Sequence, residues 1–144
     1  MIEQDTIRLL RECDAGIKMG ISSIEDVLPI ITDDNFRQIL QENKTEHEKL
    51  QEDLQSLLQE YHDEGKDPNP MAKGMSWIKT NMELAVNDSD KTIAKLMTEG
   101  CNMGVTSLHK YLNQYQDANE KAKKLTEKIS ALEQKLAEDI RQYL

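Results

Sequence analysis

Proline, glycine and aromatic residues are all scarce in this sequence. The chain has three prolines and six glycines, and 4% of its residues are aromatic, whereas leucine, lysine, glutamate and glutamine are abundant. Proline and glycine disfavour helices, so their scarcity beside many helix-forming residues is typical of an all-α protein. At 144 residues the chain has the length of one domain and can bury a core without cross-links.

Disulfide pairs, a signal sequence and long apolar runs are missing as well. Two cysteines, Cys13 and Cys101, do not make a disulfide framework. The first residues have neither the basic nor the apolar stretch of a signal peptide, and no run approaches the ~18 apolar residues of a membrane span. We therefore expect a cytoplasmic protein with reduced thiols and no membrane association.

Positive charge is in the minority. The chain has 18 Lys and Arg against 27 Asp and Glu, which gives a net charge of −9. Nucleic acids and anionic membrane surfaces both attract basic faces, so this charge argues against either as a partner. We interpret the acidity as a source of solubility.

What the sequence does contain is an internal repeat. Residues 19–24 (MGISSI) recur 84 positions later as residues 103–108 (MGVTSL), with conservative replacements. A unit of this size that occurs twice predicts a pair of similar helical hairpins. The same offset relates further residues, namely Leu28 to Leu112, Asp33 to Asp117 and Asn35 to Asn119.

Apolar residues spaced three and four apart predict four long helices and one shorter helix. In the first, Pro29 is expected to fray the last turn, and Asp33 or Asp34 then caps the second. Residues 87–90 are predicted to end the shorter helix and to provide the N-cap of the long helix that follows it. The predicted helices cover residues 2–31, a segment from about 34 to Gly65, residues 71–86, residues 90–115 and a last segment after the turn at 116–117.

The connection between the hairpins is unusually long. Neighbouring antiparallel helices need only ~2–8 connecting residues, but this chain has a crossover over residues 65–88 between hairpin one (2–64) and hairpin two (89–144). At ~1.5 Å per helical residue, the crossover could run along most of the bundle. This arrangement resembles the ferritin-like superfamily. The resemblance implies a single ferritin-like four-helix bundle over residues 1–144 and, in that superfamily, a di-iron carboxylate site.

The residues of a di-iron site are not where the resemblance would place them. Such sites take a Glu-x-x-His motif from each of two helices. Lys44 and Gln59 precede His47 and His62 by three residues, and the last helix has no histidine. Under the repeat, Glu12 corresponds to Leu96, so the carboxylates of the first and third long helices do not pair. The sequence therefore argues against di-iron chemistry.

A softer metal such as copper is the remaining metal hypothesis. Thiol, thioether and imidazole ligands favour copper(I). Methionine and free cysteine also fill cores well, so packing is the competing interpretation. A polar layer that fixes helix register is an alternative role for Asp14 and His47, with Lys18 as a charge partner. The candidate metal ligands are Cys13, Asp14, His47, Met97 and Cys101.

Four glycines lie inside predicted helices, where each costs ~1 kcal/mol relative to alanine. They are Gly16, Gly20, Gly100 and Gly104. They indicate either a pocket or a close crossing of two helices. Because Gly20 and Gly104 are related by the repeat, we predict that they pack face to face.

The predicted crossover helix has an apolar stripe beside Trp77. Met71, Met75, Ile78 and Met82 either pack on the bundle or form a surface for a protein partner or a second copy. No nucleophile is organised for catalysis, and no other cofactor is indicated. The sequence thus favours a non-catalytic ferritin-like module with a structural or interaction role; the alternative is a protein that binds a metal or cofactor.

Overall fold

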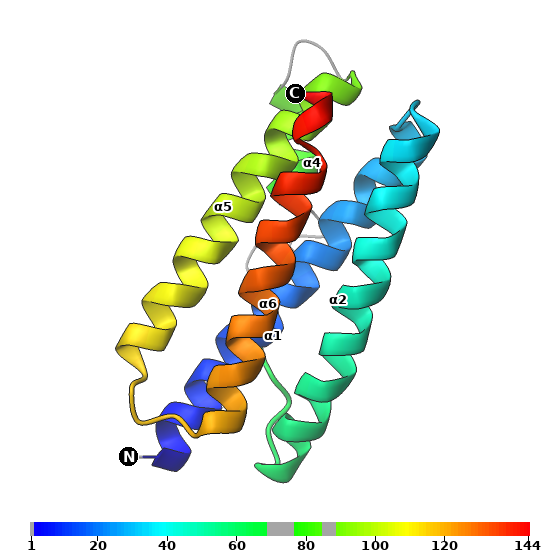
Figure 1. Cartoon of the computed structure of the whole chain (residues 1–144). Helices are drawn as coiled ribbons and strands as arrows, with labels where there is room; N and C mark the ends of the chain where they lie inside the picture. Colours follow the sequence, from blue (N-terminus) through cyan, green and yellow to red (C-terminus); the bar gives the residue numbers. More distant parts are fainter. Residues whose placement is uncertain (1, 69–76, 85–88) are drawn as a thin grey trace.

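A computed structural model describes residues 2–68, 77–84 and 89–144, and all regular structure within these ranges is helical. Four long helices lie side by side in a bundle (Figure 1). The all-α class predicted from composition is confirmed for these residues. The long helices are α1 (Ile2–Val27), α2 (Asp34–Glu60), α5 (Asp90–Gln114) and α6 (Glu120–Asp139), and a short helix α4 (Trp77–Leu84) precedes α5.

Helices α1 and α6 run in one direction along the bundle, and α2 and α5 run in the other (Figure 1). Helices α1 and α2 form one antiparallel hairpin, and α5 and α6 form the other, with the chain crossing the length of the bundle between them (Figure 1). Helix α1 packs against α2 and α5, α6 packs against the same two helices, and α1 also touches α6. Helix α4 lies against α1 and α5. None of the helices in the described ranges is both long and apolar enough to span a membrane.

The predicted helix ends agree with the structure at the caps and differ elsewhere. The side chain of Asp33 accepts from the backbone N–H of Phe36, and that of Ser89 accepts from Thr92, as N-caps do. The first helix ends at Val27, because the chain around Pro29 forms a 3₁₀ turn. Of the predicted helix over residues 71–86, only residues 77–84 fall within the described ranges, and they are helical.

The second helix ends earlier than its predicted stop at Gly65. Helix α2 closes at Glu60, and the chain then continues without helical structure to residue 68. The backbone of Gly65 has φ = +85°, a conformation that glycine adopts at little cost. The glycine therefore shapes the start of the crossover and does not terminate the helix.

The core consists of two clusters along the bundle axis. The upper cluster includes Ile24, Phe36, Ile93 and Leu136, near the α1–α2 turn. The lower cluster lies toward the α5–α6 turn and is formed by residues such as Leu9, Cys13, Leu54, Leu58 and Leu125.

Helix α4 packs on the bundle. The side chain of Ile78 is fully buried in the upper cluster, and Trp77 and Met82 pack against that cluster. For these three residues the packing interpretation of the apolar stripe holds. Met71 and Met75, the other methionines of the predicted stripe, lie outside the described residues.

At each end of the bundle, hydrogen bonds join the turn of one hairpin to the first helix of the other hairpin. At one end the carboxylate of Asp90 accepts from the backbone N–H groups of Thr32 (2.9 Å) and Asp33 (2.8 Å). At the other end the hydroxyl of Thr6 accepts from the N–H of Asn119 at 2.8 Å. Thr6 and Asp90 are related by the 84-residue offset. Corresponding positions of the two hairpins thus make corresponding contacts.

Candidate functional site

A cavity of about 340 Å³ lies in the bundle between α1, α5 and α6. His47 of α2, Trp77 and Ile78 of α4, and Pro68 of the crossover complete its wall. Its volume falls within the range of ~300–1,000 Å³ that is usual for small-molecule sites. Most of the lining is apolar, with Ile24, Met97 and Leu136 among the side chains that face it.

Small residues of α1 and α5 leave this space open. Gly16, Gly20, Gly100 and Gly104 all line the cavity. Among the described residues, a Cβ atom added to Gly16 would meet no atom within 4 Å, and one added to Gly104 would come no closer than 3.7 Å to its nearest neighbour. Gly100 is different, because an added Cβ there would lie 3.3 Å from the ring of Trp77. Three of the four glycines thus border the cavity without a close hydrophobic partner.

The predicted face-to-face packing of Gly20 and Gly104 is wrong. The atoms nearest to a Cβ built on Gly104 all belong to Glu133, and a Cβ on Gly20 would lie 3.3 Å from Oε1 of the same residue. It would also lie 2.8 Å from Nε2 of His47. The long side chain of Glu133 reaches from α6 toward both glycines, so the carboxyl group separates the two helices where we expected them to touch.

His47 and Glu133 form a buried polar pair at the cavity wall. Nε2 of His47 lies 3.0 Å from Oε1 of Glu133, and Nδ1 lies 3.0 Å from the backbone oxygen of Asn43. The side chains are 1% and 12% exposed, respectively. Because a carbonyl oxygen can only accept, Nδ1 carries a hydrogen. Burial lowers the pKa of His47, but the hydrogen bond and charge of Glu133, with the Asn43 carbonyl, outweigh it and raise this pKa overall.

Neither cysteine supplies a thiolate at neutral pH. Cys101 lines the cavity, and burial, together with the charge and hydrogen bonding of the nearby Glu133, raises its pKa. Cys13 lies in the lower cluster with its Sγ 3.1 Å from the hydroxyl of Thr126. Burial raises the pKa of Cys13 to about 12. Both thiols therefore keep their protons, and a protonated thiol is a poor nucleophile and metal ligand.

The five predicted metal ligands do not all lie together in the structure. His47, Met97 and Cys101 line the same cavity, whereas Cys13 and Asp14 belong to other parts of the bundle. Within the part of the chain that the structure describes, no three His, Cys, Asp or Glu side chains are grouped as a metal ion would require. The predicted set therefore does not form one site.

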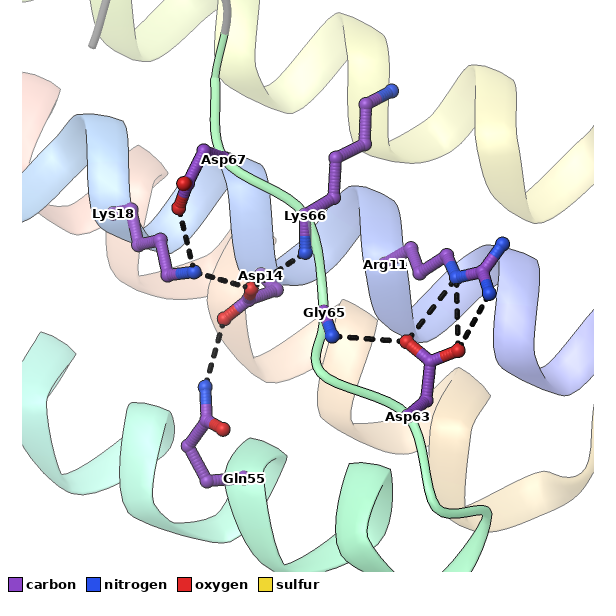
Figure 2. Close-up of polar contacts among 8 residues, drawn as sticks. All are labelled: Arg11, Asp14, Lys18, Gln55, Asp63, Gly65, Lys66 and Asp67. Atoms are coloured by element: carbon purple, nitrogen blue, oxygen red, sulfur yellow. Dashed lines mark hydrogen bonds and ion pairs between the residues drawn. The ribbon is translucent and has the colours of Figure 1, made fainter. Parts of the chain in front are cut away.

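Asp14 is the centre of a separate, closed polar cluster (Figure 2). Its Oδ1 accepts from the side-chain amide of Gln55 at 2.9 Å, and its Oδ2 accepts from the backbone N–H of Lys66 at 2.9 Å. Lys18 forms an ion pair with the same Oδ2 at 2.8 Å and also reaches Asp67. The predicted charge partner of Asp14, Lys18, is confirmed. The contacts with Lys66 and Asp67 tie the crossover to α1, and the contact with Gln55 ties α1 to α2.

Two further ion pairs hold the same stretch of the crossover. Arg11 donates to both carboxylate oxygens of Asp63, as Figure 2 shows, and this hydrogen bonding lowers the pKa of Asp63. Lys66 pairs with Glu12 at 2.7 Å. Residues 63–67 are thus fixed along α1, and the next residue, Pro68, is buried at the cavity wall. The crossover is therefore anchored directly before Pro68, where it reaches the cavity wall.

Glu133 is the site residue that sequence reasoning missed. It lies four positions after Ile129 and three before Leu136, two residues that are almost fully buried. This spacing puts all three on one helix face, so an acidic residue within the apolar stripe was the available signal. The many charges of α6 hid it, since most of them are solvent-exposed.

Comparison with known proteins found no match: no protein-family model, no curated protein and no solved structure matches the chain.

Proposed function

We propose that this chain is a non-catalytic ferritin-like bundle that binds a small, mainly apolar molecule in its central cavity. The observation that carries the proposal is the glycine-lined cavity of about 340 Å³ between α1, α5 and α6, which is partly open to solvent. Glycines inside helices reduce stability, and a bound molecule that packs into the room beside them offsets that loss.

The arrangement of helices supports the ferritin-like part of the proposal. Four long helices form two antiparallel hairpins joined by a crossover along the bundle (Figure 1). Bundles of this kind place their ligand and cofactor sites in the core, between side chains of facing helices. The cavity here lies in the same kind of position, with walls from both hairpins.

The cavity chemistry supports binding over catalysis. Both ring nitrogens of His47 are already bonded, one to the Asn43 carbonyl and one to Glu133. A general base needs a free nitrogen within reach of a substrate proton, so His47 would first have to leave Glu133. The raised pKa of Cys101 keeps the only thiol in the cavity wall protonated.

A soft metal is the second candidate, because His47, Met97 and Cys101 line one cavity. Copper(I) binding would require Cys101 to lose its proton against a raised pKa and His47 to give up its bond to Glu133. Both losses weaken a metal site relative to a purely apolar ligand. Copper near one per chain after purification, absent from a Cys101→Ser variant, would favour this second candidate.

A partner surface around Trp77 has less support than a ligand site. Trp77, Ile78 and Met82 pack against the upper cluster, which leaves these apolar side chains largely occupied by the bundle itself. Trp77 instead borders the cavity, and its backbone N–H points to the sulfur of Met19 at 3.4 Å. The sole tryptophan is therefore a reporter of what fills the cavity.

The test is titration with N-phenyl-1-naphthylamine, a neutral apolar dye whose emission rises on leaving water. We expect saturable binding to the purified protein and a concurrent change in Trp77 emission. The variant Gly104→Leu places a side chain in the cavity and should weaken binding at least tenfold.

Asn102→Leu is the matched control, because Asn102 lies on the same helix, is exposed and does not border the cavity. It should bind the dye like the unaltered protein. Equal binding by Gly104→Leu, or no saturable binding to the unaltered protein, would contradict the proposal.

A further inference from the structure

We infer that the ligand carries an uncharged hydrogen-bond donor, a hydroxyl group, that binds the carboxyl group of Glu133 while its apolar body fills the cavity. This inference rests on the proposed function, which it extends from an apolar ligand in general to a neutral alcohol. It is carried by the geometry of Glu133 and His47 at the cavity wall and by the bond between His47 and the backbone of Asn43 behind them.

His47 and Glu133 share one proton and have no net charge as a pair. Nδ1 of His47 carries a hydrogen because it faces the carbonyl oxygen of Asn43 at 3.0 Å. Nε2 faces Oε1 of Glu133 at 3.0 Å, and two lone pairs at that distance would repel each other. One proton therefore lies between them. Whether it resides on nitrogen or on oxygen, His47 and Glu133 together have no net charge.

The carboxyl group of Glu133 can still accept further hydrogen bonds. A carboxylate has about four acceptor positions on its two oxygens. His47 takes one of them, and the nearby thiol of Cys101 can take one more. The carboxyl group also lies near the Cβ positions of Gly20 and Gly104, and all three residues line the cavity. Glu133 thus presents acceptor capacity to a ligand.

The neutral His47–Glu133 pair favours a hydroxyl group over an anion or a cation as the polar group of the ligand. An anion would meet the carboxyl group of Glu133, and His47 has no N–H left to donate to it. A cation would add net charge to a neutral wall in an apolar cavity, and burying such a charge is unfavourable unless His47 first loses its proton. A hydroxyl group donates one hydrogen bond and changes no charge. A hydroxyl group is therefore the polar group that the His47–Glu133 pair can bind without a change in its protonation.

The experiment is competition against bound N-phenyl-1-naphthylamine by four compounds of similar chain length. They are 1-octanol, its isomer 1-methoxyheptane, octylamine and octanoate. The isomer has the same atoms as 1-octanol but no donor hydrogen. We expect 1-octanol to bind about tenfold more tightly than its isomer, since one hydrogen bond to a charged or buried acceptor has an effect of that size. 1-Octanol should also bind more tightly than octylamine and octanoate do.

Two variants at Glu133 locate the effect. Glu133→Met removes the acceptor and should make 1-octanol and its isomer equal. Glu133→Gln keeps an amide oxygen and should retain most of the preference for the alcohol. Because the isomer pair is compared on the unaltered protein and on the Gln variant as well, the inference stays testable if the Met variant does not fold.

The outcomes separate this inference from the proposed function. Stronger binding of octylamine or octanoate, equal binding of the two isomers, or a preference that persists in Glu133→Met would overturn the hydroxyl group and leave the apolar cavity site intact. Absence of dye binding and of any Trp77 response to all four compounds would overturn the proposed function itself.

Discussion

Two buried carboxyl groups occupy the middle of this bundle, and they are in opposite situations. Asp14 is fully buried and makes contacts with Gln55, Lys18 and the backbone of Lys66. Glu133 is bonded to His47 on one side and borders a cavity of about 340 Å³ on the other. The first carboxylate is enclosed by the protein, whereas the second has acceptor positions and open space beside it.

Burial and charge alone therefore do not mark a functional site in this protein. Both groups are acidic and both lie on the apolar side of a helix. What distinguishes Glu133 is unfilled volume next to unfilled hydrogen-bonding capacity. Asp14 instead acts as the anchor of the crossover (Figure 2). Stability should therefore depend mainly on Asp14, and ligand binding mainly on Glu133.

The largest expected effect is on stability at Asp14. Replacing Asp14 by Leu leaves the amide of Gln55, the N–H of Lys66 and the ammonium of Lys18 without their acceptor, and should lower the free energy of unfolding by about 3–5 kcal/mol. Glu12→Gln, which weakens a more exposed pair with Lys66, should cost under ~1 kcal/mol. Urea denaturation measures both. Similar losses for the two variants would remove the special role of Asp14.

The next effect is at Gly65, whose conformation and surroundings both exclude a side chain. Its φ is +85°, and a Cβ atom there would lie 2.2 Å from Oδ2 of Asp14. We expect Gly65→Ala to lower the free energy of unfolding by about 2–3 kcal/mol. Combining it with Asp14→Ala should give less than the sum of the two losses, because the clash is then relieved. Additive losses would mean that the backbone strain alone matters.

A smaller effect distinguishes the glycines of the cavity. Gly20→Ala brings a methyl group against the His47 ring and should destabilise the protein by about 1–2 kcal/mol. Gly16→Ala meets no neighbouring atom and should stabilise it by about 0.5–1 kcal/mol through helix propensity. Thermal melts of the two variants compare them directly. A stabilised Gly20→Ala would show that the His47–Glu133 pair can move aside without loss.

The smallest effect is the pH dependence contributed by His47. Its folded pKa is raised above the ordinary value of 6.5, so its contribution to stability is fully present below that value and is lost as the pH rises through the folded pKa. The stability difference between the unaltered protein and His47→Gln should therefore shrink as the pH increases from 6 upward. Glu133→Gln should abolish this dependence. A difference that grows with pH would mean that burial, not Glu133, controls the pKa of His47.

Local features of the fold could be read from the sequence, and tertiary ones could not. The N-caps were predicted to within a few residues, as Asp33 or Asp34 and as a residue of 87–90, because a cap depends on a few neighbouring residues; the structure has them at Asp33 and Ser89. The partnership of Asp14 with Lys18 was likewise within reach, since four residues separate them on one helix. Composition and spacing together predicted the all-α class.

The cavity could not be predicted for a physical reason. A glycine inside a helix removes a side chain, but the space it leaves is filled or empty depending on the distance to the next helix. Gly100 accommodates the Trp77 ring, whereas Gly16 faces open space, and both look alike in the sequence. Glu133 was missed for the same reason, because the reach of a long side chain depends on where the facing helices lie.

The hydrogen bonds at the two ends of the bundle limit how a ligand can enter. Asp5 and Thr6 hold the start of α1 to the α5–α6 turn, while Asp90 holds the start of α5 to the α1–α2 turn. The pair α1–α5 is therefore fastened at both ends. Any widening of the gap between these helices has to be an outward bend of their middle sections, which are the sections that contain the glycines. Substituting those glycines would stiffen the helices and should slow the entry and release of a ligand even where the affinity is unchanged.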